Sequence, residues 1–333
     1  ARAGLTKRSV AGLTLARCAS CLAAMRQPMS SALELAFDVL RVSVIILFCA
    51  VLVYALGSFL LMRRHTAVPP GAWLRALARE AFLAALTQPF LPLFYVLGHR
   101  MEPFLLRRGR EGLTPGEANA LARGIPVVLV HGYMHNRVAF LGLARALAKR
   151  GIGPLYGFNY PWFASLGSNA RRLERFVDRV CAVTNARAVD LVCHSLGGLL
   201  ATEMMRLASQ KDALRVRRCV TLATPHAGIA WRGPILGAGA ASLRRGSSLL
   251  EAHAGHVVAV RTLSIFSTHD NIVHPAETSR LARRGGRDLE IEGLGHLSIL
   301  FSSEVADQVA AFLSEADPAP PDPGVGSTPP VGG

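Results

Sequence analysis

The sequence predicts an α/β fold, a mostly parallel sheet with helices on both faces. Between residues 125 and 313, short apolar runs alternate with segments of helical periodicity, which is typical of right-handed βαβ units. The first run, Ile125–Val130, is continuously apolar, as expected of a central strand buried on both faces. Several runs end in polar residues, and the carboxyl ends of parallel strands are where such sheets carry their active sites.

The elements follow from periodicity and from end signals. Leu141–Lys149 is expected to be a helix that Gly151 ends as a C′ residue. Residues 169–183 place their apolar side chains on one helical face. Further strands are expected at residues 155–159, 189–193, 218–223, 263–268 and 288–292, and further helices at 199–205 and from 298 onward.

The rest of the domain is organised around Val189–Gly198 (VDLVCHSLGG). A short apolar run ends at His194-Ser195, and a turn of small residues leads into a helix. A strand that turns sharply into a helix with serine at the apex is a nucleophile elbow, which holds the hydroxyl clear of the sheet. The positions two before and two after the serine must be small; Gly197 meets this requirement, and Cys193 is small enough to be tolerated. Alone, the stretch could equally be a buried strand with a glycine-rich turn.

Two other strand ends supply partners for Ser195. Strand 263–268 ends at His269-Asp270, and strand 288–292 leads to His296. Serine, acid and histidine in this order form a hydrolase triad, in which His296 is the general base and Asp270 orients its ring. The acidic residues nearer to the histidine precede it too closely for this role: Asp288, Glu290 and Glu292. The remaining histidines near strand ends are interpreted as turn or supporting residues: His194, His226, His269 and His274.

A third strand end, His131-Gly132-Tyr133, is expected to lie beside the elbow. Acyl transfer builds negative charge on a carbonyl oxygen, so two preorganised N–H groups are needed to stabilise it. The candidate donors of this oxyanion hole are the peptide N–H groups of Tyr133 and Leu196. The alternative interpretation of His131-Gly132 is a plain turn.

Residues 42–62 (VSVIILFCAVLVYALGSFLLM) are uncharged and about as long as a membrane-spanning helix, roughly 20 residues. Arg41 and Arg63-Arg64 bracket them. A cleaved signal peptide is the alternative, but its apolar region would be shorter and nearer the start. The sequence therefore predicts a transmembrane helix over 42–62, after an N-terminal segment over 1–41.

A membrane-proximal helical segment is expected over residues 63–111. Its apolar stretch, Ala81–Gly98, contains Pro89 and Pro92 and is expected to lie in the membrane interface or to pack on the next domain. A second, kinked span is the alternative. Arginines stand on both sides of the stretch, so the side of the membrane that carries the main domain stays open.

The net charge of +15 comes almost entirely from arginine. These arginines are scattered along helices, and aromatic residues make up only 7%, so we expect contact with anionic lipid headgroups and no binding of nucleic acid. Cys18 and Cys21 have metal-site spacing but no second ligand pair, so no zinc or other metal site is expected. The six cysteines suggest no disulfide framework.

Taken together, these motifs resemble the bacterial lipase/esterase branch of the α/β-hydrolase superfamily. The resemblance covers about 125–313 and is carried by VVLVHGY, VCHSLGG, LATPHAG, STHDNIVHP and GLGHLSIL. It implies an α/β-hydrolase fold, a triad of Ser195, Asp270 and His296, and cleavage of carboxylic esters, often acylglycerols, without an organic cofactor. Cys193 departs from the commonest elbow pattern of this branch.

The α/β-hydrolase domain is expected over residues 112–316, with a cap at about 226–256. Related lipases carry a lid at this place, and Trp231, Ile235 and Leu236 are expected to bind the acyl chain. The alternative is a surface segment that packs on the domain and does not move. The proline- and glycine-rich tail, 317–333, is expected to be disordered.

The sequence thus predicts a membrane-anchored serine ester hydrolase of lipase or carboxylesterase type, located in the bacterial inner membrane and acting on a lipid or small ester. Acyl transfer and thioester cleavage by the same triad are the enzymatic alternatives. An inactive binding protein on the same fold is the alternative of another class. The sequence leaves the oligomeric state open.

Overall fold

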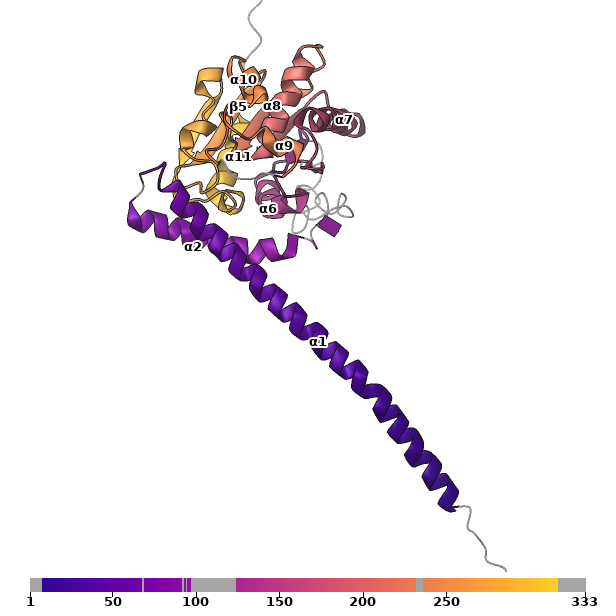
Figure 1. Ribbon diagram of the computed structural model, residues 1–333. Helices are drawn as coiled ribbons and strands as arrows, with labels where there is room; N and C mark the ends of the chain where they lie inside the picture. Colours follow the sequence, from indigo (N-terminus) through magenta and orange to yellow (C-terminus); the bar gives the residue numbers. More distant parts are fainter. Residues whose placement is uncertain are drawn as a thin grey trace, which may run out of the picture.

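The computed structural model describes residues 8–67, 69–91, 93, 95–96, 124–231 and 236–316, with side chains from residue 31 onward except that of Ala240. Residues 124–316 form an α/β domain, and a long N-terminal helix projects away from it (Figure 1). The tail over 317–333, part of 63–111, and Ile235 lie outside the described residues.

The α/β domain is built on one sheet of six strands. All neighbouring strands are parallel, in the order β2-β1-β3-β4-β5-β6. The strands are β1 (Val127–Val130), β2 (Leu155–Phe158), β3 (Val189–His194), β4 (Val216–Leu222), β5 (Arg261–Ser267) and β6 (Arg287–Ile291). The expected mostly parallel sheet is therefore confirmed. The central strands β1 and β3 are buried along their whole length, because helices cover both faces.

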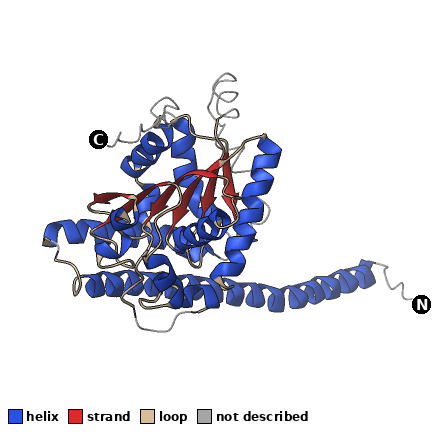
Figure 2. Cartoon of the chain, turned by 90° about the horizontal axis from the view of Figure 1, so that it is seen from above, coloured by secondary structure: helices blue, strands red, loops and turns tan. Residues whose placement is uncertain are grey.

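Helices flank the sheet on its two faces (Figure 2). α6 (Leu141–Lys149) and α11 (Ser303–Ser314) pack on one face through side chains such as Leu147 and Val309. α7 (Leu166–Thr184) and α8 (Leu196–Ser209) pack on the other face through Leu173 and Leu199. Gly151 follows α6 with φ +76°, which is the left-handed conformation expected of a C′ glycine.

Short helices fill the connections of the domain. Their bounds are η2 (Arg137–Phe140), α9 (Ala238–Ala241), α10 (Ser248–Ala254), η3 (Ala276–Ser279), η4 (Ala282–Arg284) and η5 (Ser298–Phe301). α9 and α10 belong to the segment expected to form a cap. η5 begins two residues after His296, and Ser298 at its start accepts the peptide N–H of Gly295, the residue before that histidine.

Among the described residues before the domain are the helices α1 (Arg8–Met62) and α2 (Pro70–Thr87) and a 3₁₀ turn, η1 (Gln88–Phe90). α1 runs without a break through residue 41, where the sequence suggested a boundary. The end of α1 packs on α2, burying Phe59 and Met62 against Trp73 and Ala76. α2 in turn reaches the α/β domain, because Ala84 belongs to the same core cluster as α6 and α11.

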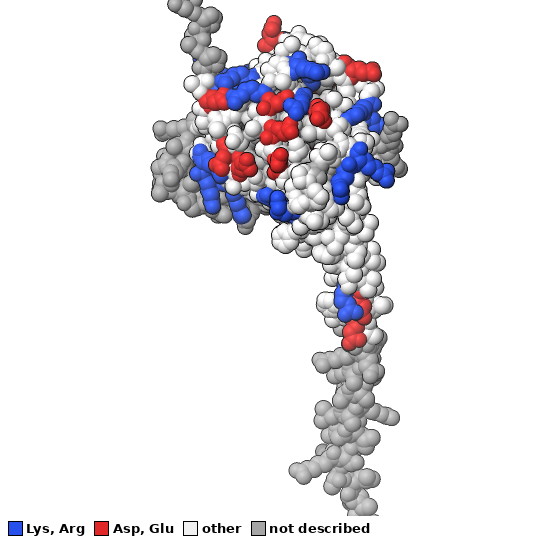
Figure 3. All heavy atoms as spheres, turned by 90° about the vertical axis from the view of Figure 1, so that its left-hand side faces the viewer, with Lys and Arg blue, Asp and Glu red and all other residues white. Residues whose placement is uncertain are grey.

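Within the described residues, one helical segment, Ser31–Met62, is long and apolar enough to cross a membrane. It includes the whole of the expected span 42–62. Its large apolar side chains are mostly exposed in the protein alone, as for Ile46 and Val53. Figure 3 shows that the part of the projecting helix nearer the α/β domain is almost uncharged and that a small group of charged side chains lies further along it.

A buried arginine joins β4 to the end of α11. Arg218 is fully buried, and its guanidinium donates to the carbonyl oxygens of Phe312, Leu313 and Glu315, at 2.9, 2.8 and 2.5 Å. These carbonyls lie at and just beyond the last turn of α11, where a helix has acceptors without intrahelical partners and a partial negative charge.

We therefore expect Arg218→Met to lower the free energy of unfolding by about 2–4 kcal/mol, since three charge-assisted hydrogen bonds to buried acceptors are lost. The matched control is Arg287→Met, which removes an exposed arginine paired with Glu315 and should cost less than about 1 kcal/mol. The measurement is the urea midpoint, followed by tryptophan fluorescence, of the detergent-solubilised protein. Equal midpoints for the two variants would contradict a capping role for Arg218.

Candidate active site

Ser195 stands at the sharp turn between β3 and α8. Its backbone has φ +54° and ψ −123°, a strained conformation for a residue with a side chain. A Cβ atom at Gly197 would overlap the carbonyl oxygens of Val130 and His131 at the end of β1. The turn is therefore possible only with a residue as small as glycine at that position, as the elbow pattern requires. Cys193 is fully buried in β3 and fits among its neighbours.

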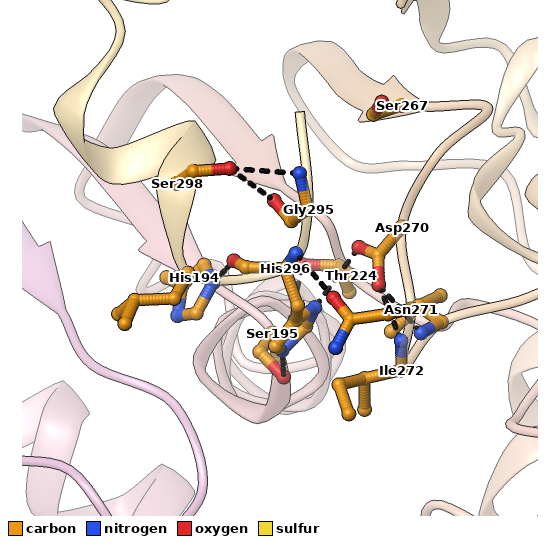
Figure 4. Close-up of polar contacts among 12 residues, drawn as sticks. His194, Ser195, Thr224, Ser267, Asp270, Asn271, Ile272, Gly295, His296 and Ser298 are labelled. Atoms are coloured by element: carbon orange, nitrogen blue, oxygen red, sulfur yellow. Dashed lines mark hydrogen bonds and ion pairs between the residues drawn. The ribbon is translucent and has the colours of Figure 1, made fainter. Parts of the chain in front are cut away.

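The structure brings the three residues of the expected triad together (Figure 4). His296 Nε2 lies 3.0 Å from Ser195 Oγ, and His296 Nδ1 lies 2.9 Å from Asp270 Oδ2. The three side chains come from the ends of different strands: Ser195 follows β3, Asp270 follows β5, and His296 follows β6. The arrangement can transfer a proton from the serine hydroxyl to the imidazole while the carboxylate holds the other ring nitrogen.

Asp270 is fixed in place by its own loop. Its second oxygen, Oδ1, accepts hydrogen bonds from the peptide N–H groups of Ile272 and Val273, at 2.8 and 2.7 Å. The alternative acids are engaged elsewhere or point outward: Asp288 accepts from Leu281 N, Glu290 pairs with Arg280, and Glu292 is exposed. The geometry thus favours Asp270 as the orienting acid.

The surroundings of His296 favour its protonated form. Burial by itself lowers the pKa of His296, but the charge and hydrogen bond of Asp270 and the charge of Glu80 outweigh burial and raise the pKa above its ordinary value of 6.5. The two nearest histidines behave differently from His296: burial lowers the pKa of His135 to about 4 and holds the pKa of His194 well below its ordinary value. Both are therefore neutral at pH 7.

The expected oxyanion-hole residues lie on either side of Ser195. Leu196 is the first residue of α8, and the first N–H groups of a helix have no intrahelical acceptor. Tyr133 follows Gly132, whose backbone approaches the elbow so closely that an added Cβ would lie 2.9 Å from Ser195 Cβ. The role of both N–H groups stays a prediction, although the close approach of the two loops is what such a role requires.

The segment expected to form a cap contacts the loop after β1 through Tyr133. The Tyr133 hydroxyl donates to the carbonyl oxygen of Leu236 at 2.9 Å and accepts from its peptide N–H at 3.1 Å. The side chains of Leu236 and Trp231 are exposed, by 68% and 46%. Two leucines of the same segment, Leu243 and Leu250, are buried in the core cluster that also contains side chains of α8.

Three residues that the sequence analysis did not assign support the loop of His296. Asn271 Oδ1 accepts from His296 N at 3.0 Å, and Asn271 Nδ2 donates to Ser58 Oγ of α1 at 2.8 Å. Glu80 of α2 accepts from the two peptide N–H groups that follow His296. One signal could have revealed Glu80: it is the only charged residue of the buried face of α2, whose other members are Trp73, Ala76 and Ala84.

Comparison with known proteins agrees with this architecture. Residues 127–264 match the model of the alpha/beta hydrolase family. Among solved structures, Aspergillus fumigatus lipase B is 18% identical with a TM-score of 0.50, over 59% of this chain and 54% of that chain. Mature Bacillus licheniformis lipase BlEst2 is also 18% identical, with a TM-score of 0.49, over 57% of this chain and 91% of that chain. The chain thus spans about half the length of the Aspergillus lipase.

The sheet order, the elbow and the family match define a protein of the α/β-hydrolase fold. The α/β-hydrolase fold that the motif resemblance implied is confirmed. At 18% identity the Aspergillus lipase shares the fold with this chain, and the chemistry of the site has to be argued from the chain's own residues.

Proposed function

We propose that the protein is a membrane-anchored serine carboxylic-ester hydrolase that acts on lipid-like or acylglycerol esters through an acyl-enzyme. The observation that carries this proposal is the hydrogen-bonded relay from Ser195 through His296 to Asp270, with the serine on a strained elbow. A strained serine with an adjacent base that a third group orients is the signature of an activated nucleophile.

In the proposed reaction, Ser195 Oγ attacks the ester carbonyl carbon while His296 Nε2 takes the hydroxyl proton. The negative charge moves to the carbonyl oxygen, which the peptide N–H groups of Tyr133 and Leu196 stabilise. The intermediate collapses with cleavage of the C–O bond, and His296 returns the proton to the leaving alcohol. Water then repeats the sequence on the acyl-enzyme and releases a carboxylic acid. Asp270 stabilises the imidazolium in both halves of the reaction.

The test of the proposed function is covalent labelling by a fluorophosphonate probe. We expect the detergent-solubilised protein to bind one probe at Ser195, located by peptide mass spectrometry, and to lose ester hydrolysis in parallel with labelling. Ser195→Ala should not be labelled, whereas Ser209→Ala, which removes an exposed serine from the same helix, should be labelled normally. Normal labelling of Ser195→Ala would rule out the proposed nucleophile.

The membrane anchor in this proposal is α1, and the proposed location is the bacterial inner membrane. Two features of α1 support its retention in the mature protein. Phe59 and Met62 are buried against α2, and Ser58 bonds to Asn271 beside His296. If α1 were cleaved off as a signal peptide, the mature protein would lose these contacts. The exposed apolar side chains of Ser31–Met62 are suited to lipid.

The acyl chain is proposed to lie along the exposed side chains of Trp231 and Leu236, with Ile235 between them in sequence. Each methylene that such a surface buries contributes roughly 0.8 kcal/mol. We therefore expect Leu236→Asp to lower kcat/KM for p-nitrophenyl decanoate at least about tenfold more than for p-nitrophenyl acetate. Val257→Asp adds the same charge at another exposed apolar position and should affect both esters alike. Equal losses on both esters in Leu236→Asp would place the acyl chain elsewhere.

A further inference from the structure

The helices outside the α/β domain hold the loop of His296 from two sides. From α2, both carboxylate oxygens of Glu80 accept peptide N–H groups: Oε1 from Leu297 at 2.6 Å and Oε2 from Ser298 at 2.8 Å. From α1, Ser58 holds Asn271, whose side chain accepts the peptide N–H of His296. Two side chains therefore fix three consecutive backbone N–H groups, from 296 to 298. Glu80 belongs to α2, and Asn271 is held by Ser58 of α1.

The α/β domain leaves space for the Glu80 carboxylate. Gly295 directly precedes His296, and a Cβ atom there would lie 2.5 Å from both Cδ and Oε2 of Glu80. Any larger residue at this position would displace the carboxylate. Glu80 itself is only 4% exposed. A buried carboxylate is costly unless it is hydrogen-bonded, and here two N–H groups satisfy it.

We propose that Glu80 is a positioning residue of the active centre: it fixes the loop that carries His296 and places a second negative charge beside the imidazole. This inference rests on the proposed serine-hydrolase function. It makes the active centre a composite of the α/β domain and the N-terminal helices, and it gives α2 a role in the reaction besides packing.

The charges around His296 support this role. It is faced by Asp270 from the loop after β5, by Glu80 from α2, by His194 at the end of β3 and by His135 from the loop after β1. The two histidines are neutral, so the charged groups that face the imidazole are the two carboxylates. Burial raises the pKa of Glu80, while the N–H groups of the loop and the charge of His296 oppose that rise. When His296 takes the serine proton, both carboxylates stabilise the imidazolium.

The experiment is the pH profile of p-nitrophenyl butyrate hydrolysis by the full-length, detergent-solubilised protein. Glu80→Gln keeps the size of the side chain and removes its charge. We expect kcat to fall about tenfold with little change in KM, because the loss falls on the proton-transfer step. We also expect the acid limb of kcat/KM to move to lower pH, by roughly half a unit or more, because His296 loses a neighbouring negative charge.

The control is Glu292→Gln, which removes the exposed carboxylate four residues before His296 and should leave the acid limb in place. Gly295→Ala, which displaces the Glu80 carboxylate without changing it, should shift the limb in the same direction as Glu80→Gln. This second variant keeps the test decisive if Glu80→Gln does not fold. An acid limb that stays at the wild-type pH in both variants, with or without a loss of kcat, overturns the proposal.

Ser195→Ala separates this inference from the proposed function. Suppose that Ser195→Ala is inactive while the acid limb of kcat/KM in Glu80→Gln and Gly295→Ala stays at the wild-type pH. The serine-hydrolase function then stands, and the role of Glu80 is wrong. If Ser195→Ala keeps its activity, the proposed function itself fails, and the role of Glu80 fails with it.

Discussion

Ser195→Ala is expected to lower kcat for ester hydrolysis by roughly three to six powers of ten, with a smaller change in KM. The hydroxyl oxygen of Ser195 is the only nucleophile within hydrogen-bond reach of His296 Nε2 among the described residues, at 3.0 Å. Without it, the acyl-enzyme cannot form, and only transition-state stabilisation of direct attack by water remains. The measurement is kcat of the purified protein for one ester substrate, with Ser209→Ala as the matched control.

The companion variant is His296→Ala, alone and combined with Ser195→Ala. Nucleophile and base act as one unit, so the double variant should be about as slow as either single variant. Asp270→Asn should be milder but still severe, because the imidazole loses the partner that sets its tautomer. Additive losses in the double variant would show that the two residues act in separate steps.

Removal of residues 1–111 is expected to lower kcat/KM by at least about two powers of ten and to make the remaining domain prone to aggregation. The truncation takes away Ser58 and Glu80, which hold the loop of His296, and uncovers the core surface against which Ala84 packs. A displacement of about 1 Å in a catalytic group can by itself cost roughly a hundredfold in rate. The measurement compares esterase activity and sedimentation of the truncated and full-length proteins.

The matched control removes residues 1–41 only. The described side chains of this segment are exposed, and its Arg41–Asp38 ion pair lies on the surface. This shorter truncation should keep full activity in detergent and should resist extraction from membranes by alkaline carbonate, since Val42–Met62 remains. A soluble, fully active product of the longer truncation would contradict the composite active centre.

The geometry around Ser195 was within reach of the sequence, for a physical reason. In a parallel sheet all strands end at the same edge, so residues at strand ends meet whatever the distance between them in the chain. Ser195 and Asp270 follow largely apolar runs, and His296 follows the strand 288–292, in which acidic and apolar residues alternate; these strand ends were enough to place the three residues together. The small residue at 197 and the close approach of Gly132 follow from the steric requirements of the elbow.

The contacts of the N-terminal helices were beyond such reasoning. Whether an apolar helix packs on a domain or lies in the membrane interface depends on which surfaces fit, and periodicity carries no information on the partner. Glu80 interrupts an apolar stripe, which signals a buried polar contact without naming the acceptor or donor. The burial of Leu243 and Leu250 could not be predicted for the same reason, because an apolar residue in a loop can face either a substrate or the core.

The order of the elements along the chain has a consequence for biosynthesis. Met62 ends α1, whereas His296 lies near the end of the α/β domain. A ribosome adds roughly 5–20 residues each second, so the proposed anchor emerges about 10 to 50 seconds before His296. Only after the last strand and α11 have been made can the loop of His296 dock between Asp270 and the helices that precede the domain. On the proposed function, the growing chain would stay inert toward esters during its synthesis, and the hydrolytic centre would first form after the proposed anchor has reached the membrane.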